Sequence, residues 1–404
     1  MNTVSCAMVL CVLALGLVAA GCAAGPKGPR PAPLPGAAEL PDVDELPDPF
    51  RMNDGSRVKT LADWAKRRDE MKAMILYYEY GHMPPAPKSI QAAVTSTKTI
   101  LDGAATEKRL TLAMGPGLKI AFRVNLVTPA GQGPFPVIVR NDGELGQVPV
   151  LAEVVRRGYM VAEYNRCDLD PDANNVVGPA QAAYPDYDWA TLAVWAWGGL
   201  RVIDYLETLP MVDGTRIIVT GHSRGGKTAL LQGAMDERIA LTVPNGSGCG
   251  GAGCYRVKQG ESLEQITNPQ RFSYWFHPRF RDFADKETRL PFDQHFLKAL
   301  VAPRALLSTD AIGDAWANPL GTQQTFTAAK TVFEWLGAGA KNGASVREGG
   351  HDQNAEDWAA LLDFADLVLF NKPPAGGRKF DPMRFPDARP LFSWTAPPAP
   401  KAGK

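Results

Sequence analysis

The sequence has no excess of charge of either sign. Its 404 residues include 43 Lys and Arg and 43 Asp and Glu, so no global charge argues for binding to nucleic acid or to an anionic surface. No internal repeat is visible, and the hydrophobic fraction of 45% is ordinary for a globular protein with a substantial core. These observations leave one large domain or two smaller ones.

Cysteine and histidine are scarce. Beyond the N-terminal apolar run only Cys22, Cys167, Cys249 and Cys254 remain, which is no disulfide framework, although a Cys249–Cys254 bridge is compatible with the spacing. The chain has no Cys or His pairs at the spacing of structural zinc ligands, so we expect no metal site.

The apolar run at the N-terminus, Val4–Ala20, is too short for a comfortable membrane span. Small residues follow it before Cys22, an arrangement that resembles a bacterial lipoprotein signal. The pattern departs from that signal because Met1–Ser5 has no Lys or Arg and Ala19 stands where Leu is usual. We expect residues 1–22 to be a signal peptide and the protein to be exported. A lipidated Cys22 would anchor it in the periplasm or on the cell surface; plain cleavage nearby would secrete it.

The most informative segment of the sequence is Arg216–Leu230. Four β-favouring residues, Ile217–Thr220, run into Gly221-His222-Ser223-Arg224-Gly225, and helix-forming residues follow at once. This predicts a strand, a sharp turn and a helix, with Ser223 at the apex. There a strained backbone exposes Oγ, and the helix N-terminus directs N–H groups at a developing oxyanion. Lone G-x-S-x-G matches are common, but this context favours a nucleophile over an ordinary surface turn.

Short apolar strands alternate with amphipathic helices from Phe135 onward. The expected strands are Pro136–Arg140, Tyr159–Tyr164, Arg216–Thr220, Ala240–Val243, Ala305–Ser308 and Ser345–Arg347. The expected helices are Val148–Arg157, Trp189–Leu209, Lys227–Met235, Gln294–Leu300, Thr322–Leu336 and Ala355–Phe370. A helix from Leu61 and an antiparallel pair, Lys108–Met114 and Leu118–Val127, precede them.

This order predicts an α/β-hydrolase domain over residues 48–372, a three-layer αβα sandwich around a mostly parallel, twisted sheet. The polar, aromatic-rich segment Gly250–Pro291 is expected as an insertion over the carboxyl edge of the sheet. Residues 23–47, rich in Ala, Pro and Gly, are expected to be a flexible tether. The Pro-rich tail, residues 373–404, is expected to wrap the surface or to be loose.

A serine nucleophile needs a base and an acid, and in this fold the chain order is Ser, acid, His. Among five histidines only His351 follows the last expected strand. The acid is expected in the loop after Ala305–Ser308, where Asp314 at the loop tip is favoured over Asp310. His295 is expected to be a satisfied structural histidine rather than a second base.

Two cations follow the serine. The backbone N–H of Arg224 is positioned for the oxyanion, and its guanidinium could add charge there. Lys227, one helical turn after Ser223, could bind sugar hydroxyls or a carboxyl oxygen, although a solvated helix face is the alternative. In the insertion, Glu261, Glu264 and Gln265 could reach sugar hydroxyls, but we prefer to interpret them as solvated loop residues.

The assembled residues resemble glucuronoyl esterases of carbohydrate esterase family 15. The nucleophile signature of that family, G-[C/H]-S-R-x-G-K, is matched from Gly221 to Lys227. Further resemblance lies in Tyr80-Gly81 before Pro84, Ser247–Gly251, Pro291–His295 with Ala302-Pro303-Arg304, and Asp314-Ala315-Trp316, so it spans roughly residues 50–370.

The resemblance implies hydrolysis of esters that join 4-O-methyl-glucuronoyl groups of xylan to lignin alcohols, without a metal or organic cofactor. It implies Ser223 as nucleophile, His351 as base and Arg224 as oxyanion stabiliser. It also implies Lys227 and Trp316 as contacts to the uronic acid. The protein is expected to act as a monomer on glucuronoxylan–lignin esters, with no nucleic-acid partner.

The sequence departs from fungal members of the family at three places. One is Cys254, which matches a bridged Cys of those members but has no identifiable partner in this sequence. Fungal members carry a catalytic Glu where this chain has Gly246, which leaves the acid to Asp314, a position seen among bacterial members. They also join a Cys before the nucleophile to a Cys after the histidine, where this chain has His222 and Asp352. We hypothesise that a hydrogen-bonded or ionic His222–Asp352 contact replaces that bridge.

Two other functions compete with this one. An acetyl xylan esterase or another carbohydrate ester hydrolase would use the same nucleophile, but Arg224 and Lys227 modestly favour an acyl group with polar oxygens. A carbohydrate-binding surface lipoprotein that keeps the fold without turnover is suggested by Gly246 and opposed by Asp314.

Overall fold

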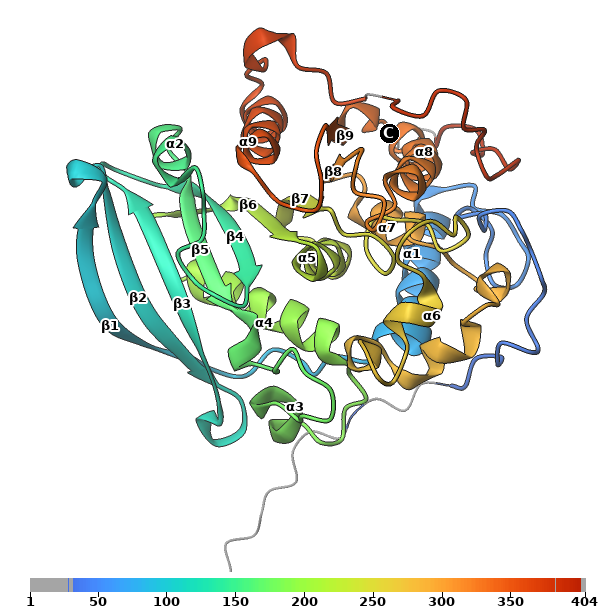
Figure 1. Cartoon of the computed structure of the whole chain (residues 1–404), viewed down its shortest axis with the longest axis horizontal. Helices are drawn as coiled ribbons and strands as arrows, with labels where there is room; N and C mark the ends of the chain where they lie inside the picture. Colours follow the sequence, from blue (N-terminus) through green and yellow to red (C-terminus); the bar gives the residue numbers. More distant parts are fainter. Residues whose placement is uncertain (1–27, 29–31, 382, 401–404) are drawn as a thin grey trace, which may run out of the picture.

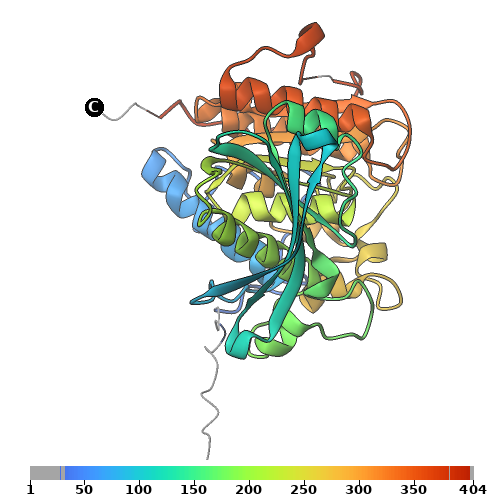
Figure 2. The ribbon, with the colours of Figure 1, turned by 90° about the vertical axis from the view of Figure 1, so that its left-hand side faces the viewer.

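The computed structural model describes residues 28, 32–381 and 383–400 (Figure 1). A nine-stranded sheet runs through this part in the order β1-β2-β3-β5-β4-β6-β7-β8-β9. Its strands are β1 (Ile90–Ile100), β2 (Ala105–Met114), β3 (Ile120–Pro129), β4 (Phe135–Asp142), β5 (Met160–Asn165), β6 (Val212–His222), β7 (Ile239–Asn245), β8 (Ala305–Ala311) and β9 (Asn342–Arg347). The pairs up to β3–β5 are antiparallel and the rest are parallel. Figure 2 views the antiparallel edge.

Helices cover both faces of the sheet because its strands are apolar on both sides. The helices are α1 (Leu61–Ile75), α2 (Leu151–Arg156), α3 (Pro179–Ala183), α4 (Thr191–Leu206), α5 (Arg224–Met235), α6 (Leu263–Ile266), α7 (His295–Val301), α8 (Pro319–Trp335) and α9 (Ala355–Phe370). Val139 and Val219 belong to the larger core with α1, α4, α5 and α7, whereas Ile138 and Ile218 face α2 and α9. The predicted α/β-hydrolase sandwich is therefore confirmed, and every predicted strand and helix is present, most with shifted ends and Ala355–Phe370 with the predicted ones.

One strand was not predicted. β1 pairs with β2 at the edge of the sheet, and most of its side chains are exposed. Its sequence, IQAAVTSTKTI, is largely small and polar and lacks the strict alternation that signals a half-buried strand.

The helix that begins the domain changes its winding before it ends. α1 carries a capping box between Thr60 and Asp63, and it continues as a π-helix over Leu76–Tyr80. Gly81 ends it at φ 76°, where a Cβ would lie 2.1 Å from the carbonyl oxygen of Asp188. Glycine is thus required by both the backbone and the neighbouring loop.

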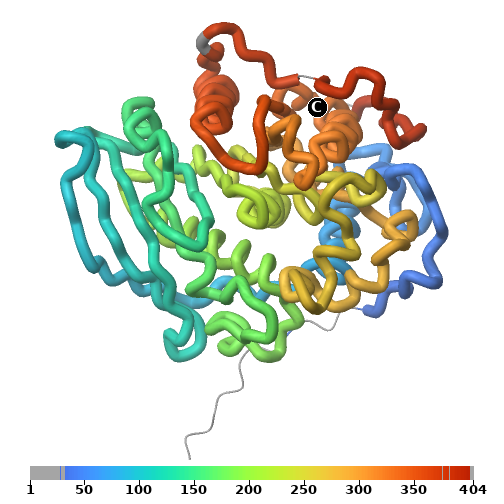
Figure 3. The backbone as a smooth tube through the Cα atoms, viewed as in Figure 1, coloured from blue at the N-terminus to red at the C-terminus, as the bar shows by residue number. Residues whose placement is uncertain are grey.

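The predicted flexible tether over residues 23–47 is wrong for the described part, residues 28 and 32–47. Leu46 is only 1% exposed, and its N–H donates to the carbonyl of Leu391 at 2.7 Å. Val43 N–H donates to Thr288 O, so the segment lies along the insertion and the C-terminal tail (Figure 3). The tail wraps the surface, as one of the two alternatives predicted. Within the described residues no helix is both long and apolar enough to span a membrane; the predicted signal peptide and Cys22 lie outside them.

Candidate active site

Ser223 stands in a strained turn between β6 and α5. Its backbone has φ 55° and ψ −120°, a conformation that costs about 1–3 kcal/mol and persists only where the surroundings impose it. Gly221 permits the turn, because a Cβ there would lie 2.4 Å from the carbonyl oxygen of Gly225. Asn141 Nδ2 donates to that same oxygen at 2.9 Å and ties the turn to the end of β4. The turn therefore presents Oγ at the carboxyl edge of the sheet.

The structure brings His351 and Asp314 to this serine. His351 lies between β9 and α9, and its Nε2 is 3.0 Å from Ser223 Oγ. Its Nδ1 is 2.6 Å from Asp314 Oδ2 in the loop after β8. A serine, an imidazole and a carboxylate in series can remove a proton from the hydroxyl and stabilise the resulting imidazolium.

The two candidate acids have different surroundings. Asp314 also accepts the N–H of Ala317 at 3.1 Å. Burial alone would raise its pKa, but these hydrogen bonds, with that of His351 foremost, lower the pKa of Asp314 below its usual value, so it stays ionised. Asp310 is the penultimate residue of β8 and is buried with Lys298, and burial raises the pKa of its carboxyl. Only Asp314 contacts His351.

Arg224 begins α5, so its backbone N–H belongs to the first turn and has no acceptor within the helix. Its guanidinium turns away toward the insertion, where Nη1 lies 2.6 Å from Asp172 Oδ2 and the group stacks 4.7 Å from the centre of the Trp275 ring. Tyr274 and Trp275 donate to the other oxygen of Asp172. Although burial alone would raise it, these bonds and Arg224 lower the pKa of Asp172, so the ion pair is maintained.

Lys227 is buried rather than solvated. Its Nζ donates to the carbonyl oxygens of Ser247 and Cys249 at 2.7 and 2.5 Å and to Glu261 Oε2 at 2.6 Å. All three donors are thus used, and contact with a substrate would require one bond to be exchanged. Glu261, which we preferred to interpret as a solvated loop residue, is buried beside Lys227, and this part of the prediction is wrong. Sequence spacing gave no signal for that pair.

Trp316 is exposed at the same edge, with 37% of its surface accessible. Arg271 of the insertion lies 6.0 Å above its ring, and the backbone oxygen of Trp316 accepts the N–H of Glu261. The insertion therefore lies beside Arg224 and Trp316 at the carboxyl edge of the sheet.

The comparisons with known proteins agree on one family. The family model described as "Glucuronyl esterase, fungi" matches residues 113–337. A carbohydrate esterase from an unknown prokaryotic organism is 32% identical over 382 residues, which cover 79% of this chain and 88% of that protein. The chain belongs to the glucuronoyl esterase family.

Two further relatives of the glucuronoyl esterase family span fungi and bacteria. The 4-O-methyl-glucuronoyl methylesterase 1 of Wolfiporia cocos is 34% identical over 303 residues, 72% of this chain and 71% of that protein. The solved glucuronoyl esterase of carbohydrate esterase family 15 from Caldicellulosiruptor kristjansonii has a TM-score of 0.77 at 32% identity, and the match covers 89% of this chain and 98% of that one.

Within this glucuronoyl esterase the predicted His222–Asp352 contact is wrong. Asp352 is bound by Arg347, whose Nη2 lies 2.5 Å from Asp352 Oδ1. His222 Nδ1 instead lies 2.7 Å from Asn245 Oδ1, and its ring packs 4.6 Å from that of His351. Because an amide oxygen only accepts, Nδ1 of His222 carries the proton.

Gly246 borders this imidazole pair. It has φ 48°, and a Cβ built on it would lie 3.3 Å from the ring of His222 and 3.7 Å from Asp314 Oδ2. The position at which fungal members are expected to hold their acid thus adjoins the carboxylate that contacts His351. Glycine leaves this space to His222 and Asp314.

Neither the buried cysteines nor His295 form a hydrogen bond with Ser223, Asp314 or His351 in the described structure. Cys249 and Cys254 are both buried and free, so the possible bridge between them is not formed. His295 is fully buried with Nε2 2.8 Å from the oxygen of Pro47, and burial lowers its pKa to about 4. It is a buried, neutral histidine, as predicted, but the prediction that it is satisfied is wrong, because its Nδ1 has no hydrogen-bond partner among the described residues.

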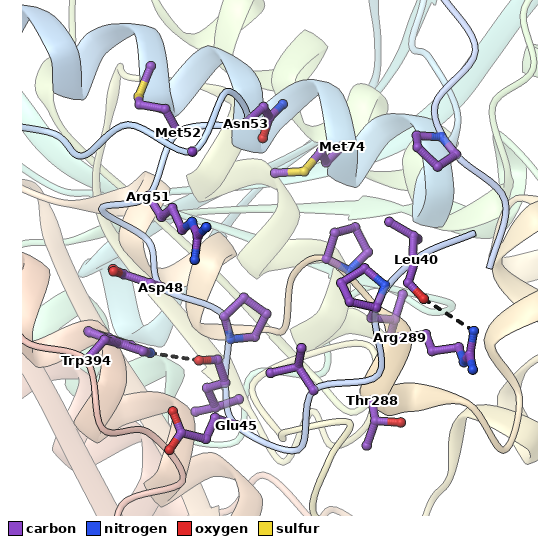
Figure 4. Close-up of a pocket in the computed structure, with 18 of the residues that line it drawn as sticks. Leu40, Glu45, Asp48, Arg51, Met52, Asn53, Met74, Thr288, Arg289 and Trp394 are labelled. Atoms are coloured by element: carbon purple, nitrogen blue, oxygen red, sulfur yellow. Dashed lines mark hydrogen bonds between the residues drawn. The ribbon is translucent and has the colours of Figure 1, made fainter. Parts of the chain in front are cut away.

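One cavity of the described structure lies apart from the candidate active site. It measures about 920 Å³ and lies between the N-terminal segment and the insertion, with Leu40, Arg51, Met74 and Trp394 among its lining residues (Figure 4). None of the three residues Ser223, Asp314 and His351 lines it. The His351 side chain is instead 35% exposed and Ser223 is half-buried, so solvent can reach both residues.

Proposed function

We propose that this protein is an exported serine esterase that hydrolyses 4-O-methyl-glucuronoyl esters, the bonds between glucuronoxylan and lignin alcohols. The observation that carries the proposal is the chain of hydrogen bonds from Ser223 Oγ through His351 to Asp314, found in a member of the glucuronoyl esterase family. The partial exposure of Ser223 and His351 supports a substrate that approaches from solvent.

The reaction would proceed through an acyl-enzyme. His351 Nε2 takes the proton of Ser223 as Oγ attacks the ester carbonyl, and the tetrahedral oxyanion accepts the N–H of Arg224. His351 then donates the proton to the leaving alcohol and later removes one from water, which releases the uronic acid. Asp314 holds the Nδ1–H tautomer and stabilises the imidazolium.

Substrate recognition would fall to the side of the insertion. Trp316 offers an exposed ring for the sugar, and Lys227 with Glu261 offers a buried charge pair whose hydrogen bonds can be exchanged for those of hydroxyl groups. Such polar contacts discriminate sugars because an unmatched buried donor is costly. The Arg224 guanidinium is paired with Asp172, so the contribution of Arg224 to the oxyanion would come from its backbone N–H.

We further propose that the protein is exported through residues 1–22, anchored by lipidated Cys22 and active as a monomer. These proposals rest on the N-terminal sequence alone. Metabolic labelling with a palmitate analogue would test the anchor, since Cys22→Ser should abolish incorporation if Cys22 carries the lipid.

The experiment that tests the function compares benzyl glucuronate with an aryl acetate as substrates of the form lacking residues 1–22. We expect strong cleavage of the glucuronate ester and its loss, about 10³-fold or more, in Ser223→Ala. Cleavage of the acetate alone would replace the substrate class. No cleavage, together with no labelling of Ser223 by a fluorophosphonate probe, would favour a carbohydrate-binding protein without turnover.

A further inference from the structure

The loop that carries the predicted base is built around one buried arginine. Arg347 is the last residue of β9 and its side chain is 3% exposed. The guanidinium donates to the carbonyl oxygens of Glu348, Gly350 and Asp352, at 2.9, 3.4 and 2.6 Å. It also pairs with the carboxylates of Asp352 at 2.5 Å and Asp357 at 2.8 Å.

This arrangement explains how an exposed loop can hold a side chain in one place. Gly349, Gly350 and His351 are all exposed, and two adjacent glycines would by themselves leave the backbone free. The loop instead passes around the guanidinium so closely that a Cβ on Gly349, at φ 103°, would lie 2.8 Å from Arg347 Nη1. A planar group with five donors can hold three carbonyls and two carboxylates at once, which lysine cannot do.

The backbone of the same residue holds the loop that carries Asp314. The carbonyl oxygen of Arg347 accepts the N–H of Ile312 at 2.8 Å. One residue further, a Cβ on Gly313 would lie 2.5 Å from the oxygen of Gly349, so the two loops touch. Arg347 is thus the point from which both the acid loop and the histidine loop are fixed.

We propose that Arg347 is a positioning residue for the reaction, and that its side chain sets the place of His351 between Asp314 and Ser223. The proposal rests on the proposed function, because it assigns a role in the same reaction. Arg347 touches none of these three side chains in the described structure, and it acts through the backbone of the loop. Nucleophile and base must be held within fractions of an ångström, and a displacement of about 1 Å can cost about 10²-fold in rate.

The first comparison uses two adjacent glycines. Gly349→Ala forces a Cβ against the guanidinium, whereas a Cβ on Gly350 would meet nothing within 4 Å. Both positions are exposed, so both variants should fold. We expect kcat for benzyl glucuronate to fall at least 10-fold in Gly349→Ala with KM unchanged, and to stay within about 2-fold in Gly350→Ala. Equal kcat values in the two variants would overturn the proposal.

The second comparison uses two arginines. Arg304 also holds four carbonyl oxygens, those of Gly233, Asp236, Ile239 and Leu300, but at the opposite edge of the sheet, before β8. Arg347→Met and Arg304→Met should both lower the melting temperature. On the folded protein, only Arg347→Met should lose about 10²-fold or more in kcat, and Arg347→Lys should recover part of that loss. A loss in Arg347→Met that merely equals that in Arg304→Met would make Arg347 structural.

Labelling of Ser223 by a fluorophosphonate separates this proposal from the substrate assignment, because labelling needs the base but no sugar. A parent enzyme that labels without cleaving glucuronate esters would overturn the substrate and leave the labelling rates of the variants as the test of Arg347. A parent that does not label would overturn both proposals.

Discussion

Two imidazole rings lie against each other at the candidate active site, and only that of His351 is hydrogen-bonded to Ser223. His222 is held by Asn245, whose Nδ2 in turn donates to Thr309 Oγ1 at 2.9 Å. Burial, offset in part by the hydrogen bond with Asn245, lowers the pKa of His222, so it stays neutral where a second cation would oppose the imidazolium of His351. Its ring packs against that of His351 and restricts the position of that imidazole.

Removal of the His222 ring should therefore change the position of His351. We expect His222→Ala to reduce kcat about 10-fold and the free energy of unfolding by about 1–3 kcal/mol, because it leaves a cavity beside His351. Asp352→Ala should leave the ring of His222 in place. Kinetics with benzyl glucuronate and urea denaturation would measure both; a His222→Ala enzyme with wild-type kcat would contradict the interpretation.

The choice between the two aspartates can be tested directly. Asp314→Asn should lose about 10³- to 10⁴-fold in kcat, since an amide cannot stabilise the imidazolium and favours the wrong tautomer. Asp310→Asn should stay within about 10-fold while losing stability, because Lys298 then lacks its acidic neighbour. Retention of activity in Asp314→Asn would move the acid elsewhere.

Sequence could identify Ser223 and His351 because each has a positional signature: one in a strand–turn–helix, the other alone after the last strand. It left Asp310 and Asp314 open because both are in the same short stretch, and only the end of β8 at Ala311 separates a residue inside the sheet from one in the loop. It missed the Lys227–Glu261 pair and the role of Arg347, because both depend on distances between segments that no local pattern encodes.

At the scale of elements, the π-helix after α1 holds a buried carboxyl. Glu79 Oε1 accepts from Tyr255 Oη at 2.6 Å and Gln294 Nε2 at 2.9 Å, whereas Oε2 has no partner among the described residues. Burial raises the pKa of Glu79 to about 8, so the carboxyl is protonated at neutral pH. Such irregular turns let one side chain leave the regular helical face, here toward the insertion.

This carboxyl should make stability depend on pH. The folded pKa of Glu79 is raised above its unfolded value of 4.5, so the folded state binds more protons between them, and stability falls as pH rises toward 8. Glu79→Gln keeps an acceptor for Tyr255 and does not titrate. We expect the free energy of unfolding of Glu79→Gln, relative to wild type, to gain about 1–2 kcal/mol from pH 6.5 to pH 8 in urea denaturation. A constant difference would contradict the assignment.

β1 illustrates why an edge element escapes sequence analysis. It contributes little to either core, and its polar residues pair only with β2, so what defines it is the backbone ladder rather than side-chain burial.

At the scale of the whole molecule, the two ends of the described chain are joined. Trp394 Nε1 donates to the carbonyl of Leu46 at 2.7 Å, and Ser393 binds Glu45. Trp394 also stacks 6.2 Å from His295, whose Nε2 meets Pro47. The Pro-rich composition of both ends suggested loose chain, yet a few apolar residues among the prolines suffice to dock them.

Loss of the docked C-terminal tail should therefore lower the stability of the protein. Removal of residues 388–404 should reduce the free energy of unfolding by about 2–4 kcal/mol, since it exposes Leu46 and the ring of His295. Kinetic constants well below the melting temperature should stay unchanged, because the tail contacts none of Ser223, Asp314 and His351. Removal of residues 1–31 is the control and should alter neither the free energy of unfolding nor the kinetic constants. Equal melting temperatures for the two truncations would contradict a stabilising role of the contact between Trp394 and Leu46.

The free thiols have a practical consequence. Burial raises the pKa of Cys249 and of Cys254 well above the ordinary value for a thiol, and Cys167 is the remaining cysteine after residue 22. No disulfide is therefore formed within the described residues, and their folding does not require oxidation. A form without residues 1–22 should fold in a reducing bacterial cytoplasm, and dithiothreitol should not change its stability. The thiols of Cys249 and Cys254 should react with Ellman's reagent only when the protein unfolds. Those thiols are a built-in reporter of unfolding.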